Sequence, residues 1–98
     1  MVTENLISVV EFCKFYNVEV SFINSLQDYE LIEITMVKQA AFIHQEQLNR
    51  LEKLVRLHYD LDVNLEGLDV IHHLLERIET MQLEMLALKN KLARLQNE

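Results

Sequence analysis

The chain has little glycine, no proline and one cysteine. One glycine and no proline among 98 residues remove the commonest helix breakers, so a mostly helical fold is expected. Cys13 has no second cysteine to pair with, which excludes an internal disulfide and favours a reducing compartment. No apolar run approaches the roughly 18 residues that cross a bilayer, and the first residues lack the pattern of a secretory signal. We therefore expect a cytoplasmic protein without a membrane segment.

Basic residues are scarce in the first third of the chain. Lys14 is the only base within residues 1–34, whose acids are Glu4, Glu11, Glu19, Asp28, Glu30 and Glu33. Residues 35–98 are nearly balanced, and the whole chain has a net charge of -7. An acidic first segment repels phosphate and attracts basic protein surfaces.

No arrangement of residues indicates catalysis or strong metal binding. No serine lies in a glycine-bounded nucleophile elbow, and Gly67 stands alone instead of in a phosphate-binding loop. Asp69, a histidine of the pair 72–73 and Glu76 share a helix face that would hold one weak ion, but such sites normally need a second helix. Cys13 occupies an apolar helical position, typical of a buried thiol. We expect no enzyme, no cofactor and no metal.

A helix-turn-helix unit is predicted near the start of the chain. Ser8 and Glu11 have the spacing of a capping box, which begins a helix ending at about residue 16. A short turn over residues 17–19 leads to a second helix over about 20–29, with no Lys or Arg between residues 19 and 34. The side chains expected to face the core are Val9, Phe12, Cys13, Ile23 and Leu26.

A hairpin and a third helix are predicted next. Residues 31–37 and 40–43 are rich in β-branched side chains and partly alternate, which indicates a hairpin, or wing, that turns at residues 38–39 without Asn-Gly chemistry. A helix over about 45–59 follows, and Asn64 is suited to cap the next one. In the helix over residues 45–59, the inward residues are expected to be Leu48, Leu51, Leu54, Val55 and His58.

The strongest pattern lies in the last third of the chain, where nothing interrupts a helix from Leu65 to about Leu95. Apolar residues recur there at alternating spacings of three and four, which is a coiled-coil seam. The seam residues are Ile71, Leu74, Ile78, Met81, Met85, Leu88, Leu92 and Leu95. Such a helix extends roughly 45 Å, beyond what a small head covers. We predict a head over residues 1–64 and a homodimerisation helix over 65–98; the alternative is a helix folded back on its own head, and the pairing direction stays open.

This order of elements resembles the MerR-like winged helix-turn-helix fold, whose members dimerise through an antiparallel coiled coil. Within that fold, two segments resemble the CbpM family of chaperone modulators. The first is Glu11-Phe12-Cys13, and the second is Val55-Arg56-Leu57-His58-Tyr59-Asp60-Leu61-Asp62-Val63-Asn64-Leu65-Glu66-Gly67-Leu68-Asp69-Val70-Ile71. The resemblance implies a mainly α protein that binds the J-domain of a CbpA-like co-chaperone and inhibits its cooperation with DnaK.

A MerR-like transcriptional regulator that binds DNA is the alternative. DNA-binding members usually carry arginine in the recognition helix and in the wing, where the matching positions here are Asn24 and Ala41. The Gly-Leu pair that usually follows the recognition helix appears as Glu30-Leu31. These departures, with the acidic charge, make direct DNA binding the less favoured interpretation.

The partner surface is predicted from charge and expected exposure. J-domains carry a basic second helix, which an acidic head complements. Phe15 and Phe22 cannot both point inward beside Phe12 and Ile23, so one exposed aromatic anchor is expected, ordinary edge packing being the alternative. The predicted contact residues are Glu19, Phe22, Asp28, Glu30 and Glu33, with Asp60 and Asp62 as additions.

Overall fold

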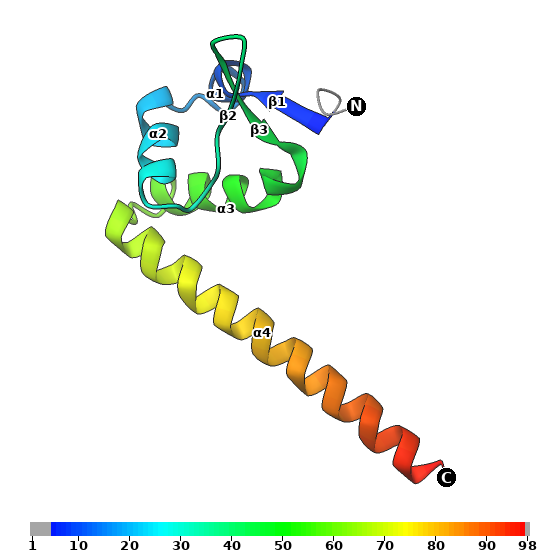
Figure 1. Ribbon diagram of the computed structural model, residues 1–98. Helices are drawn as coiled ribbons and strands as arrows, with labels where there is room; N and C mark the ends of the chain where they lie inside the picture. The colour runs from blue at the N-terminus through cyan, green and yellow to red at the C-terminus, as the bar shows by residue number, and fades with distance from the viewer. Residues whose placement is uncertain (1–4, 98) are drawn as a thin grey trace.

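The structure is a computed structural model that describes residues 5–97. A compact head of short helices and a small sheet stands on one long helix (Figure 1). The elements in chain order are β1 (Leu6–Ser8), α1 (Val9–Tyr16), α2 (Val20–Asp28), β2 (Thr35–Val37), β3 (Ala40–His44), the 3-10 helix η2 (Gln45–Gln47), α3 (Leu48–Tyr59) and α4 (Leu65–Gln96). The predicted fold class, a mainly helical winged helix-turn-helix head with a long C-terminal helix, is confirmed.

The wing belongs to a three-stranded antiparallel sheet in the order β1-β3-β2. Lys38 and Gln39 both have positive φ angles, 51° and 66°, as a tight hairpin turn requires, although neither is Asn or Gly. The predicted first strand over residues 31–37 is too long, because only its last three residues pair with β3. Strand β1, whose Ile7 lies opposite Ile43, was not predicted.

The helix-turn-helix forms as the capping and periodicity indicate. The Ser8 side chain accepts a hydrogen bond from the Glu11 backbone N–H at 3.3 Å, so the serine half of the capping box begins α1. Asn17 ends α1 with a left-handed φ of 58°, which asparagine tolerates better than most residues. The core of the head contains all the inward residues predicted for α1 and α2, together with Phe22.

The end of α2 is closed by two hydrogen bonds that wrap around Glu30. The Glu30 N–H donates to the Gln27 carbonyl at 2.8 Å, and the Leu31 N–H donates to the Leu26 carbonyl at 2.9 Å. This is a Schellman cap, whose left-handed residue is usually glycine. Here Glu30 holds that position with a φ of 61°, and Leu31 and Ile32 then turn into the core as loop residues.

Helix α3 forms the floor of the head, and α4 leaves from its C-terminal end. The predicted third helix starts with the 3-10 turn η2, and Leu51, Leu54 and Val55 are buried as expected, while Leu48 and His58 are half-buried. The Asn64 side chain caps α4 by accepting the Gly67 N–H at 2.8 Å. Figure 1 shows α4 running away from the head, in a molecule 58 Å long. The helix does not fold back on its own head.

Candidate protein-interaction surfaces

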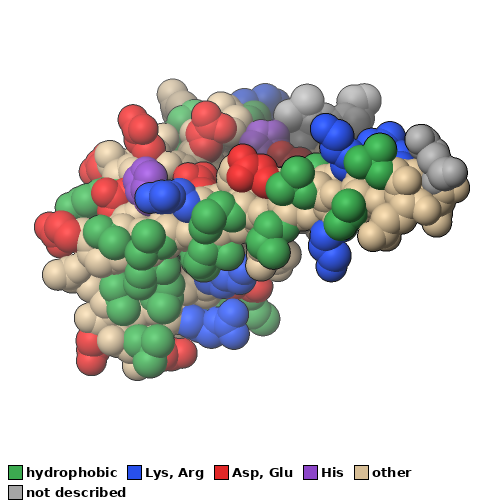
Figure 2. Space-filling view, turned by 90° about the horizontal axis from the view of Figure 1, so that it is seen from below, with side chains coloured by type: hydrophobic (Ala, Val, Ile, Leu, Met, Phe, Trp, Pro, Cys, Tyr) green, Lys and Arg blue, Asp and Glu red, His purple; other side chains and the backbone are tan. Residues whose placement is uncertain are grey.

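The first candidate surface is the apolar seam of α4. Leu68 is the only buried residue among those described for α4. Apart from the half-buried Ile71, every predicted seam residue has an exposed fraction between 46% and 66%. In Figure 2 hydrophobic side chains are spaced along the long helix, with Lys and Arg side chains beside them. An exposed apolar face of this length indicates an interaction site.

The seam begins inside the angle between α3 and α4. A hollow of about 610 Å³ lies there. Its lining residues are Lys53, Arg56, Leu57, Asp60, Leu61, Ile71 and Leu75. The apolar surface of α4 therefore continues onto the C-terminal half of α3.

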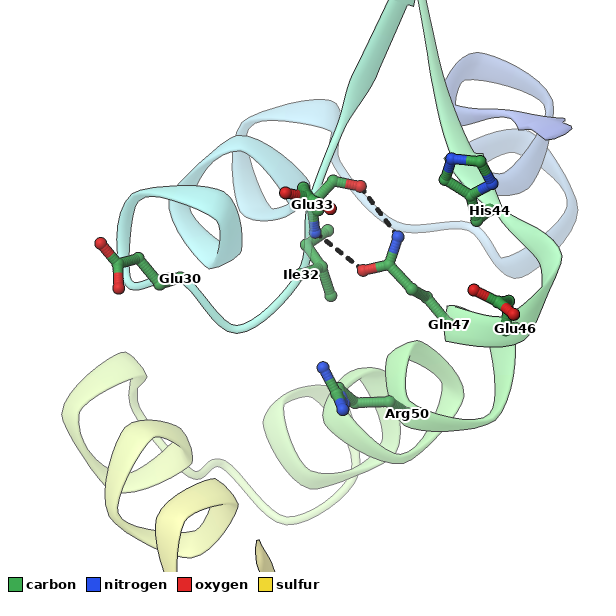
Figure 3. Close-up of a pocket in the computed structure, with 7 residues that line it drawn as sticks. All are labelled: Glu30, Ile32, Glu33, His44, Glu46, Gln47 and Arg50. Atoms are coloured by element: carbon green, nitrogen blue, oxygen red, sulfur yellow. Dashed lines mark hydrogen bonds between the residues drawn. The ribbon is translucent and has the colours of Figure 1, made fainter. Parts of the chain in front are cut away.

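The second candidate surface surrounds Glu30 and Glu33. Both line a hollow of about 360 Å³ between the end of α2 and the start of α3, shown in Figure 3. The other lining residues are Ile32, His44, Glu46, Gln47 and Arg50. Three glutamates and one arginine thus line this hollow, and in Figure 3 the Glu30 carboxylate points away from the others. The Arg50 guanidinium donates to the Leu31 carbonyl at 3.5 Å. Glu30 and Glu33 were predicted for the partner surface, whereas Glu46 and Arg50 were not.

The remaining predicted contact acids lie elsewhere on the head. The Glu19 N–H donates to the Tyr59 hydroxyl at 3.2 Å, which brings the start of α2 beside the loop that holds Asp60 and Asp62. These acids and Asp28 are exposed. The structure therefore separates the predicted partner surface into two parts, Glu30 with Glu33, and Glu19 beside the loop after α3.

Phe22 is not an exposed anchor, so this part of the prediction is wrong. Its exposed fraction is 7%, because the ring stacks on His58 at a centroid distance of 4.3 Å and meets Tyr59 edge-on. The exposed aromatic is Phe15, with an exposed fraction of 82%. Phe22 thus packs α2 against the end of α3, and it is no longer a candidate for partner contact.

Other polar clusters have structural partners. His72 pairs with Glu76, and His73 pairs with Asp69, each one helical turn apart and each at 3.3 Å. Within residues 5–97 no group of three or more candidate ligands is arranged to hold a metal ion.

Cys13 is buried, and burial raises the pKa of its thiol. In that same range no helix is long and apolar enough to span a membrane.

Helix α2, the second helix of the helix-turn-helix, contains no Lys or Arg. The exposed side of α2 includes Ser21, Asn24 and Gln27, and the wing position Ala41 is half-buried.

Among protein families, the model described as MerR HTH family regulatory protein matches residues 7–90. No curated protein gives a significant match to the chain. The matched range runs from β1 through most of α4.

Proposed function

The chain belongs to the MerR HTH family of regulatory proteins, and from this premise we propose that it acts by binding protein. Its acidic head binds the J-domain of a CbpA-like co-chaperone and inhibits the cooperation of that co-chaperone with DnaK. The proposal draws on the resemblance of residues 55–71 to the CbpM family, on the charge of the head and on the conformation of one glutamate. It involves no catalysis.

The observation that carries the proposal is the left-handed backbone of Glu30. A side chain other than glycine at such a position costs roughly 1 kcal/mol of stability. The cost falls at an exposed position, where glycine would adopt the same backbone without strain. Asn17, Lys38, Gln39 and Asp62 share this conformation, and Glu30 differs from them in lining a hollow together with two further glutamates. Strain at a residue of such a charged surface is the basis for assigning a function to its side chain. We infer that the charge of Glu30 is used in binding.

The surroundings of Glu30 suit a cationic protein partner. Glu33 and Glu46 line the same hollow, and Arg50 offsets only part of their charge. A basic helix of a J-domain is complementary to this surface, and such complementarity speeds association and selects among partners. The same charges oppose the phosphate contacts that supply most non-specific DNA affinity.

The assembly that we propose is a homodimer through α4. The seam needs a partner helix because it is exposed along most of its length. An antiparallel pair is favoured because the seam starts in the angle beside Leu57 and Ile71. An antiparallel partner brings the bare C-terminal end of its α4 into this angle, whereas a parallel partner brings its head there. The charge of α4 agrees with this direction, because its first half is acidic and its last third is basic. The acids concerned are Glu66, Asp69, Glu76 and Glu79, and the bases are Lys89, Lys91 and Arg94.

The test is a binding titration of the purified chain with the isolated J-domain of a CbpA-like co-chaperone at low salt. The double reversal Glu30→Lys with Glu33→Lys should weaken binding by at least tenfold, which is about 1.4 kcal/mol. The control is Glu11→Lys on α1, which makes the same kind of charge reversal outside the proposed surface. It should weaken J-domain binding much less. Unchanged affinity in the double variant would remove this surface from the proposal.

DNA-binding regulation is the second candidate, favoured by the family description and by the intact helix-turn-helix and wing. Asn24 and Gln27 are exposed on α2 and are able to contact base edges. A gel shift against genomic fragments at low salt separates the candidates. Tight, sequence-selective shifts would support this second function and contradict the argument from the acidic head.

A further inference from the structure

We propose that two copies of the chain pair through α4 in an antiparallel register one heptad short of full overlap, in which Arg77 of each copy faces Glu84 of the other. The occupant of the exposed seam is thus a second copy, and its C-terminal segment covers the hollow between α3 and α4. This inference rests on the proposed homodimer and deepens it by assigning the residues that fix its geometry.

The seam has two edges of different charge. When Ile71 is taken as the first core position, each edge carries one residue per heptad. The first edge carries Arg77, Glu84 and Lys91, and the second carries Leu75, Gln82 and Lys89. In an antiparallel pair each edge faces the same edge of the other helix, so the charges on the first edge decide which registers are tolerated.

Full overlap is opposed by like charges. It sets Ile71 against Leu95 of the second copy, which pairs every seam residue. The same alignment brings Arg77 beside Lys91 of the second copy, and it brings the two Glu84 side chains together. Like charges at facing edge positions destabilise a helix pair. Complete coverage of the seam therefore comes with repulsion at three places along one edge.

A shift of one heptad towards the heads replaces this repulsion with attraction. Ile71 then lies against Leu88 of the second copy, and Ile78 lies against Met81. Arg77 now faces Glu84 of the second copy, and the twofold symmetry of the pair creates this contact twice.

The displaced end of each helix finds apolar surface on the other head. After the shift, Leu92 passes beyond Ile71 of the second copy and reaches the level of the hollow beside Leu57 and Leu61. At full overlap Lys89 lies at the level of Leu75, which lines the hollow together with Lys53. The shift moves Lys89 to the level of Leu68, near the loop after α3 that contains Asp60 and Asp62. Burial lost from the seam is thus regained on the head, and a basic segment meets an acidic loop.

Two other arrangements also contain an opposite-charge pair, but each has a structural penalty. A shift away from the heads pairs Glu84 with Lys91, yet it leaves Ile71, Leu74 and the hollow uncovered. A parallel pair sets Glu84 against Lys89, yet it requires a second head within the angle between α3 and α4. Burial of the seam and the position of the second head therefore favour the shift towards the heads.

The experiment measures dimer dissociation by sedimentation equilibrium of the full chain at low salt. Arg77→Glu and Glu84→Arg should each raise the dimer Kd by about tenfold, since each places like charges at two symmetric contacts. The double variant restores both contacts with reversed polarity and should return the Kd to near the wild-type value. Asn90→Glu, on the helix face opposite the seam, is the matched control and should change the Kd little.

Each alternative geometry gives a different result. Tighter dimers for Arg77→Glu indicate full overlap and overturn the proposed register. Rescue of Glu84→Arg by Lys91→Glu indicates the opposite shift, and rescue by Lys89→Glu indicates parallel pairing; either outcome overturns it as well. A chain that stays monomeric at all concentrations refutes the homodimer itself, which is a failure distinct from a wrong register.

Discussion

The side-chain amide of Gln47 holds the backbone of Glu33 from both sides. The Glu33 N–H donates to Gln47 Oε1 at 2.8 Å, and Gln47 Nε2 donates to the Glu33 carbonyl at 2.9 Å, as drawn in Figure 3. This pair fastens the loop between α2 and the wing to the start of α3. It therefore positions the acidic hollow, although neither hydrogen bond involves a charged group.

Gln47→Ala should lower the free energy of unfolding by about 1–2 kcal/mol, because two backbone groups lose their partner in an exposed setting. The measurement is urea unfolding followed by circular dichroism. Gln45→Ala, an exposed neighbour in the same 3-10 turn, should change stability by less than about 0.5 kcal/mol. Equal effects of the two substitutions would contradict a specific role for the Gln47 amide.

Much of this fold was predictable because its signals are local. The cap at Ser8, the turn at Asn17 and the cap at Asn64 each depend on residues three or four positions apart, and each lies where predicted. Strand β1 was missed because three residues show no periodicity and pair with a strand far along the chain. The hydrogen bonds between Gln47 and Glu33 also join segments that are distant in the sequence. No local sequence pattern predicts them.

The candidate surface was predicted less well than the fold. Charge identified Glu30 and Glu33, because acidic side chains are nearly always exposed. The choice between Phe15 and Phe22 depended on how α2 packs against α3, and helical periodicity alone does not supply that packing. The stacking of Phe22 on His58 decides it, and Arg50 enters the acidic hollow for a comparable tertiary reason.

Truncation of Phe22 should destabilise the protein far more than truncation of Phe15. Phe22→Ala removes a buried ring between α2 and α3 and should cost about 3–4 kcal/mol of unfolding free energy. Phe15→Ala removes an exposed ring and should change stability by no more than about 0.5 kcal/mol. Thermal and urea unfolding of the two variants check this pair. A destabilised Phe15→Ala variant would contradict the exposure described for that side chain.

Gly67 should resist a substitution that normally stabilises helices. Replacing a helical glycine by alanine typically gains up to about 1 kcal/mol. A Cβ at this position would lie 2.8 Å from Val63 Cγ1 and 3.1 Å from Asn64 Oδ1, so it would disturb the cap of α4. We expect Gly67→Ala to be neutral or destabilising in urea unfolding. In an Asn64→Ala background the loss should shrink, and a full gain in the wild-type background would contradict the crowding.

Alkaline pH should release one contact between α1 and α3. The Tyr16 hydroxyl donates to the Glu52 carboxylate, and this hydrogen bond is the main reason that the pKa of Tyr16 is raised above its ordinary value. A raised pKa means that the associated stability is fully present below the ordinary tyrosine pKa of about 10 and is lost as pH rises through the folded-state value.

Phenolate absorbance during a pH titration measures this effect. Tyr16→Phe should remove one late-titrating tyrosine, and Glu52→Gln should shift that tyrosine to lower pH because the carboxylate no longer opposes its ionisation. A titration that is unchanged by Glu52→Gln would contradict the contact.

The most direct test of the account is the J-domain affinity of Glu30→Gly. Glycine relieves the left-handed strain at the end of α2, so the variant should unfold at higher urea with a gain of about 0.5–1 kcal/mol. The same change removes the carboxylate that we assign to the partner surface, so binding to a CbpA-like J-domain at low salt should weaken. A more stable protein that binds less well is the predicted result. A more stable protein that binds the J-domain as tightly as the wild type would contradict the claim that the charge of Glu30 is used in binding.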